Sequence, residues 1–139
     1  MPYPEEWVSP AREELVKIGV RELKTAAEVD EAFAKRGVTT LVVVNSICGC
    51  AAGSARPAIA DALSSGPVPD ELTSVFAGQD LEATERAREY FRPQPPSSPS
   101  VALMHDGKLV FMLHRQQIEG RDPASISKAL KEAFAMYCA

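Results

Sequence analysis

The chain has 139 residues, of which 45% are hydrophobic and 24% charged, and its formal net charge is −4 at pH 7. This size suits one domain with its own hydrophobic core, which we expect to span residues 1–139. The acidic balance argues against nucleic acid as a partner, because phosphate binding needs clustered Lys and Arg. Without an apolar run of roughly 20 residues or a signal-peptide pattern at residues 1–6, we expect no membrane contact and a cytoplasmic location.

The first third of the chain predicts a helix, a short strand and a second helix. Residues 4–18 carry apolar side chains at helical spacing. A short strand is expected at residues 20–23. Thr25 is followed three residues later by Glu28, which is the signature of a capping box. The helix that begins there is expected to end at Gly37.

A β-branched run then predicts the centre of the sheet. Residues 41–44 read Leu-Val-Val-Val, and apolar side chains on both faces indicate a strand buried on both sides. The strand is expected to end at Asn45 and Ser46. The small residues of segment 49–63 predict a helix, which Pro57 should kink because it lacks an amide hydrogen.

The next part of the chain predicts a strand, a helix and an irregular loop. Residues 72–77 form the strand, and Asp80 is expected to cap a helix that runs to about Phe91. Residues 92–100 contain four prolines and three serines, so we expect a loop there.

The C-terminal part predicts a hairpin and a final helix. Two short apolar runs, 101–104 and 109–113, flank an Asp-Gly pair at 106–107, which is a strong hairpin signal. Asp122 and Pro123 are expected to cap and open the last helix. The alternation of strands and helices predicts an α/β fold, with a mixed sheet that has helices on both faces.

The chemistry of this sequence lies at Cys48 and Cys50. Cys48 follows the buried strand and Cys50 begins the next helix, where free N–H groups and the helix dipole stabilise a thiolate. We therefore expect Cys48, the more exposed residue, to be the nucleophile and Cys50 to resolve the mixed disulfide. Gly49 lets the two sulfurs approach, and a disulfide across one residue closes a small, strained and therefore labile ring.

Two other interpretations of the cysteines are weaker. Both can be small buried hydrophobes, or they can be two ligands of a metal site. A metal site needs further ligands from His105, His114 or Cys138, and the standard zinc spacings are absent. We therefore expect no metal.

A longer pattern surrounds the two cysteines. Its parts are Val42–Gly53, Ala55–Ala58, Val75–Asp80, Arg88–Phe91, Pro96–Ser100, His114-Arg115, Ile118–Gly120 and a cysteine near the C-terminus, Cys138. In these segments the chain closely resembles the bacilliredoxin family, long labelled as disulfide isomerases of thioredoxin-like fold. The resemblance covers nearly the whole chain.

The resemblance implies a thioredoxin-like sheet with an N-terminal helical extension. It implies that Cys48 attacks a mixed disulfide between a client protein and bacillithiol, a low-molecular-weight thiol that acts as co-substrate, with no other cofactor. The client is released reduced, and Cys48 carries the bacillithiol until Cys50 or another thiol removes it. The resemblance also favours Pro99 as the cis proline before a strand beside the cysteines, with the backbone of Ser98 pairing with an extended substrate.

Three polar residues are further candidates for substrate binding or thiolate stabilisation. Arg56 lies about two turns along the helix from Cys48 and is suited to a thiol's carboxylates, although a solvated helix position fits equally well. Asn45 and Ser46 are placed to donate hydrogen bonds near the thiolate, or simply to end the strand.

The remaining expectations concern the surface and the assembly. We expect His114 and Arg115 at the surface, and Cys138 as an inert surface thiol rather than an intermolecular disulfide. Trp7 and the N-terminal helix are expected to pack on the domain or on a neighbour, in a monomer or weak homodimer. Two alternative functions stay open: a general protein disulfide isomerase or reductase, and a non-enzymatic redox-sensing or metal-binding module.

Overall fold

The predicted order of helices and strands is confirmed in the computed structural model, which describes residues 3–49 and 51–138. The elements are α1 (Glu5–Val16), β1 (Arg21–Glu22), α2 (Ala26–Phe33), β2 (Thr39–Asn45), α3 (Arg56–Ala62), β3 (Glu71–Phe76), α4 (Leu81–Tyr90), β4 (Ser100–His105), β5 (Lys108–Leu113) and α5 (Pro123–Tyr137). A π-helical segment, Ala51–Ala55, precedes α3, and a 3-10 turn, Arg115–Gln117, follows β5.

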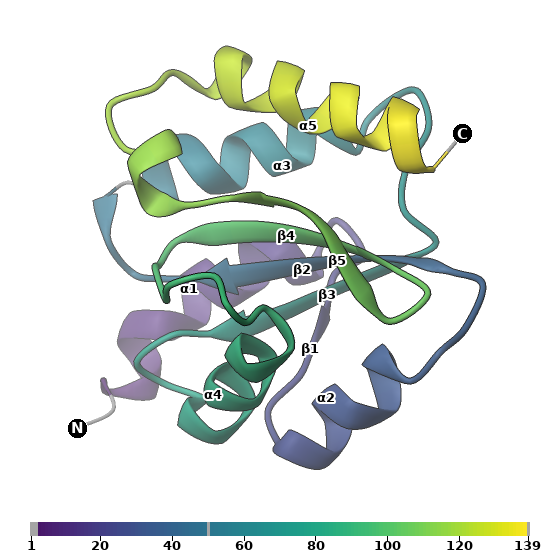
Figure 1. Ribbon diagram of the computed structural model, residues 1–139. Coiled ribbons are helices and arrows are strands. Elements are labelled where there is room, and N and C mark those ends of the chain that lie inside the picture. The colour runs from purple at the N-terminus through teal and green to yellow at the C-terminus, as the bar shows by residue number, and fades with distance from the viewer. Residues whose placement is uncertain (1–2, 50, 139) are drawn as a thin grey trace.

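One mixed sheet organises these elements, with the strand order β1-β3-β2-β4-β5 (Figure 1). β1 and β2 run parallel to β3, while β4 is antiparallel to β2 and β5 is antiparallel to β4. The carboxyl ends of β2 and β3 therefore meet at one edge of the sheet. β4 begins at that same edge, because Ser100 pairs with Val44.

β2 is the buried centre that its β-branched run predicts. Every residue of the strand is buried, and successive side chains enter opposite cores because they alternate between the two faces. Leu41 and Val43 pack with the core on the side of α3 and α5. Val42 and Val44 pack with the core on the side of α2 and α4. Each buried valine stabilises the fold by about 1.5–3 kcal/mol.

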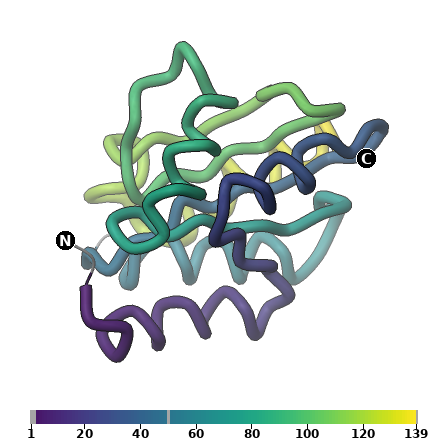
Figure 2. The backbone as a smooth tube through the Cα atoms, turned by 90° about the horizontal axis from the view of Figure 1, so that it is seen from below, coloured from purple at the N-terminus to yellow at the C-terminus, as the bar shows by residue number. Residues whose placement is uncertain are grey.

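Helices cover both faces of the sheet, as predicted. α3 and α5 lie together on one face, and α2 and α4 lie together on the other (Figures 1 and 2). α1 lies beside these layers and contacts β1 and α3. Its inner face packs Val8 and Ala11 against Phe76, the last residue of β3. The N-terminal helix therefore packs on its own chain, whereas Trp7 on its outer face is 62% exposed.

A buried guanidinium fixes α1 to the rest of the fold. Arg12 donates to Glu5 at 2.7 Å, to Glu22 at 2.9 Å, and to both carboxylate oxygens of Asp80 at 2.7 and 3.0 Å. These carboxylates hold the pKa of Arg12 above its usual value, even though burial acts in the opposite direction. The prediction that Asp80 caps α4 is therefore wrong for its side chain, which makes no capping bond. A bidentate pair with Arg12 is the stronger interaction.

Other local signals have the predicted effect, with differences at two places: α2 ends at Phe33, before the predicted stop at Gly37, and Pro57 acts differently. Thr25 accepts a hydrogen bond from the Glu28 amide, and Asp122 accepts one from the Ser125 amide, so both cap their helices. Pro57, however, does not kink one continuous helix. The chain is π-helical up to Ala55, and Pro57 lies in the first turn of α3, where a missing amide hydrogen costs little.

The helices are short compared with a bilayer. α5 has 15 residues, and none of the helices formed by the described residues is long and apolar enough to cross a membrane.

Candidate active site

Cys48 lies just beyond the carboxyl end of β2, where the chain turns into the next helical segment. Its side chain is half-buried. Its amide donates to Ser46 Oγ at 3.1 Å, and its carbonyl accepts from the amides of Ala51 and Ala52 at 3.1 and 3.2 Å. Cys48 therefore follows the strand as predicted, and its carbonyl accepts the first hydrogen bonds of that helical segment. The other cysteine of the motif, Cys50, lies outside the described residues.

A buried arginine supports this turn from behind. Arg56 is 5% exposed, and its Nη1 donates to Asn45 Oδ1 at 3.0 Å and to the Ser46 carbonyl at 2.7 Å. Its Nε donates to Glu14 on α1 at 2.9 Å. Asn45 is itself 3% exposed and donates its amide to the Ala11 carbonyl at 3.1 Å. The alternative of a solvated Arg56 is wrong, because its guanidinium is buried and joins the end of β2 to α1.

The loop before β4 lies at the same edge of the sheet. Its Ser98–Pro99 peptide bond is cis, as is the bond before Pro93. Pro99 is buried and directly precedes Ser100, which pairs with Val44 near the end of β2. Pro99 therefore stands directly before β4, which pairs with the strand that precedes the cysteine motif.

His114 and Arg115 hold this loop, although the sequence predicts surface positions for both. The two nitrogens of the His114 ring lie 3.2 Å from Ser97 Oγ and 2.9 Å from Gln94 Oε1. The Arg115 guanidinium donates to the Ser98 carbonyl at 3.2 Å, and its amide donates to Ser97 Oγ at 3.3 Å. Both residues are half-buried. Both lie in a segment by which the sequence resembles the bacilliredoxin family, and that resemblance is the signal that marks them in the sequence.

The other candidate metal ligands lie at the opposite end of the sheet. His105 ends β4 and pairs with Thr39, the first residue of β2. Cys138 packs against the core. Burial raises the pKa of its thiol, and a hydrogen bond with Thr39 offsets part of this rise. Within residues 3–49 and 51–138, no three His, Cys, Asp or Glu side chains form a cluster that could hold a metal. His105 and Cys138 therefore do not join Cys48 in one site.

Comparison with known sequences places the chain in a family. The family model described as "Disulphide isomerase" matches residues 3–138. A bacilliredoxin of Geobacillus kaustophilus is 56% identical over 131 residues, which cover 94% of this chain and 90% of the relative. A bacilliredoxin of Salinibacter ruber is 51% identical over 140 residues, which cover 99% of this chain and 81% of the relative.

Comparison with solved structures identifies the fold. The thioredoxin of Fasciola hepatica matches with a TM-score of 0.58 at 19% identity, covering 85% of this chain and 99% of that one. Oxidised mitochondrial thioredoxin 3 of Saccharomyces cerevisiae matches with a TM-score of 0.56 at 16% identity, covering 86% and 98%. The predicted thioredoxin-like sheet with an N-terminal helix is thus confirmed, and the chain belongs to the bacilliredoxin family of thiol–disulfide oxidoreductases.

Proposed function

We propose that the protein removes bacillithiol from S-bacillithiolated client proteins in the cytoplasm, with Cys48 as nucleophile and Cys50 as resolving residue. The observation that carries the proposal is the position of Cys48. Its half-buried side chain follows the carboxyl end of the central strand and precedes a helical segment. Thiolates are favoured at such helix starts, and the thiolate is the species that attacks a disulfide.

The proposed reaction is two successive thiol–disulfide exchanges. The Cys48 thiolate attacks the bacillithiol sulfur, the bond between that sulfur and the client breaks, and the client leaves as a thiolate that takes up a proton. A second thiolate, from Cys50 or from a free low-molecular-weight thiol, then attacks the Cys48 sulfur and displaces bacillithiol. With Cys50, the enzyme is left as a disulfide, so two low-molecular-weight thiols in turn, or one dithiol, must supply the two electrons and two protons that restore it, and they leave as a disulfide.

We propose that Arg56 and Asn45 act as positioning residues, in place of the direct substrate contact that the sequence suggests. Both side chains are more than nine-tenths buried, and their hydrogen bonds go to Ser46, Glu14 and Ala11. Because Ser46 Oγ accepts the Cys48 amide, this network sets the backbone from which the nucleophile projects.

We propose that Ser98 and Pro99 line the approach of the mixed disulfide to Cys48. The strand register supports this, since β4 begins beside the last residues of β2. Arg115 already donates to the Ser98 carbonyl. Arg115 therefore orients the loop at Ser98 and Pro99, along which the mixed disulfide reaches Cys48.

The proposal is tested by following the release of bacillithiol from a purified bacillithiolated client by mass spectrometry. Cys48→Ala is expected to slow the first turnover by more than about 10³-fold, as the loss of a nucleophile does. Cys138→Ala is the matched control, because Cys138 lies at the other end of the sheet, and it should retain the wild-type rate. Release by Cys48→Ala at the wild-type rate would rule the proposal out.

A second assay separates this function from that of a general isomerase or reductase. The same client is prepared as the bacillithiol and as the glutathione mixed disulfide, and a scrambled-disulfide protein is refolded in parallel. The proposed function predicts that the bacillithiol adduct is the best substrate. Equal rates on both adducts, together with efficient unscrambling, favour the general activity.

A further inference from the structure

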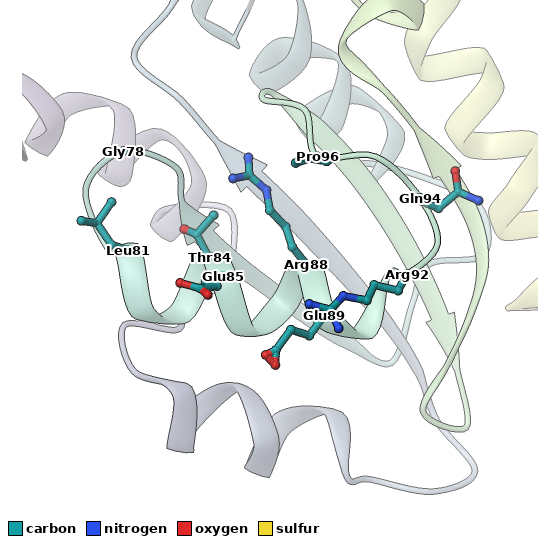
Figure 3. A pocket seen from close by; sticks show the side chains of 9 residues that line it. All are labelled: Gly78, Leu81, Thr84, Glu85, Arg88, Glu89, Arg92, Gln94 and Pro96. Atoms are coloured by element: carbon teal, nitrogen blue, oxygen red, sulfur yellow. The ribbon is translucent and has the colours of Figure 1, made fainter.

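A pocket beside the candidate active site has no role so far. It has a volume of about 540 Å³ and lies between α4, the turn after β3 and the proline-rich loop (Figure 3). Polar side chains on its wall include Thr84, Glu85, Arg88, Arg92 and Gln94. Its two arginines give it the chemistry of an anion site, although Glu85 and Glu89 on α4 also line it.

Arg88 distinguishes this pocket from the rest of the surface. Its side chain rises from the middle of α4 to the gap between Gly78 and Pro96 (Figure 3). Its Nε is buried and has no hydrogen-bond partner among the residues that the structure describes. A terminal nitrogen, Nη2, donates to the Ser97 carbonyl at the long distance of 3.4 Å. Burial lowers the pKa of Arg88 from its ordinary value.

Other arginines of the fold, buried or half-buried, are paired with carboxylates. Arg12 contacts three carboxylates, and Arg56 contacts one. Arg86, two positions before Arg88 on α4, pairs with Asp30 and Glu89. A partly buried guanidinium without a carboxylate is costly, since its desolvation is not offset by an opposite charge. Among the described residues Arg88 contacts no carboxylate, so its charge is left for an anion from outside the chain.

Part of the pocket wall comes from segments at the edge of the sheet where Cys48 lies. Gly78 follows β3, whose last residue, Phe76, pairs with Asn45 at the end of β2. On the other side, the Ser97 carbonyl that Arg88 contacts lies next to the cis Ser98–Pro99 bond. A group held at Arg88 therefore lies on the same edge as a sulfur at Cys48.

We infer that this pocket binds a carboxylate of the low-molecular-weight thiol whose sulfur is exchanged at Cys48, with Arg88 as its main ligand. The inference rests on the proposed function. It assigns a binding site to the carboxylate of the thiol, whereas Cys48 reacts with its sulfur. A carboxylate accepts charge-assisted N–H bonds from a guanidinium, and the Nη1 group of Arg88, which makes no hydrogen bond among the described residues, is the donor left for it. The pocket thereby makes carboxylate-bearing thiols better substrates than thiols without one.

The test compares two adducts of one client, bacillithiol and cysteamine, which carries no carboxylate. Wild-type protein should act on the bacillithiol adduct with the lower KM. Arg88→Gln should raise KM for that adduct by about tenfold or more, the size expected for charge-assisted hydrogen bonds. It should leave the cysteamine adduct unchanged. Arg86→Gln removes the same charge from the same helix outside the site and should change neither KM.

Several outcomes overturn the inference. An equal loss on both adducts means that Arg88 is structural or contacts a client carboxylate. A wild-type enzyme without preference between the adducts also contradicts it. A wild-type enzyme that acts on neither adduct shows instead that the proposed function fails. A binding measurement removes dependence on turnover: bacillithiol disulfide should bind Cys48→Ala more tightly than the Cys48→Ala, Arg88→Gln double variant.

Discussion

At the carboxyl end of β2, Cys48 sits half-buried at the start of a helical segment, above a turn that the buried Arg56 holds. At the amino end of the same strand, Cys138 packs against the core, near Thr39. The first thiol lies where a helical segment begins, whereas burial raises the pKa of the second. The same side chain therefore has different surroundings at the two ends of one strand, and such surroundings decide how far a thiolate is stabilised.

The largest expected difference between the two ends concerns stability. Arg56→Met should lower the free energy of unfolding by about 3 kcal/mol, because it removes the guanidinium bonds to the buried Asn45 Oδ1 and to the Ser46 carbonyl and breaks a pair with the half-exposed Glu14. Lys35→Met removes an exposed pair with Glu71 at the other end and should cost less than about 1 kcal/mol. Urea unfolding measures both, and equal losses would contradict the contrast.

The reactivity of the two thiols is the next test. In a Cys50→Ala background at pH 7, iodoacetamide should alkylate Cys48 about tenfold faster than Cys138 or more, because one pKa unit changes the thiolate fraction tenfold. Peptide mapping by mass spectrometry after timed quenching gives both rates. In urea the two rates should converge, since the difference belongs to the fold. A Cys138 that reacts first would reverse the assignment.

The arginines that donate to loop carbonyls at the two ends of β2 should have a smaller effect, which is on turnover. Arg115→Ala removes the donor to the Ser98 carbonyl and should lower turnover of the mixed disulfide by about threefold to tenfold, the size of one hydrogen bond. Arg36→Ala removes a similar donor, to the Asp106 carbonyl in the hairpin at the other end, and should leave turnover unchanged. If both variants lose activity equally, the effect is one of general stability.

The smallest predicted effect is a dependence of stability on pH. The pKa of Cys138 is raised in the folded state, so the unfolded chain loses this proton first as the pH rises. The contribution of Cys138 to stability is therefore complete below the pKa of the unfolded thiol and is lost as the pH rises through the folded pKa. Denaturant midpoints between pH 8 and about pH 10 should fall less steeply for Cys138→Ala than for wild type.

Local patterns predicted the fold well because they depend on neighbouring residues. The run at 41–44 indicated the buried strand, and Thr25 and Asp122 cap helices as their spacing indicated. Cys48 was placed correctly after β2 for the same reason. The family resemblance, rather than periodicity, singled out Pro99 among four prolines.

Contacts between distant residues could not be predicted in this way. Asp80 is a local cap by its spacing, but Arg12, 68 residues away, binds it instead. Arg56 resembles any solvated helix residue until α1 brings Glu14 beside it. The contact between Arg88 and the Ser97 carbonyl, like the bonds of His114, depends on where the proline-rich loop folds back. Helical or strand periodicity carries no information on these pairings.

Trp7 has a practical consequence for the measurements described above. It is the sole tryptophan of the chain, and it is 62% exposed on α1 with the Tyr3 ring centroid 6.4 Å away. Its indole is already largely in water in the folded state, so its emission should shift little when the chain unfolds. Circular dichroism is the better probe of global unfolding, which leaves tryptophan fluorescence free to report events at the outer surface of α1.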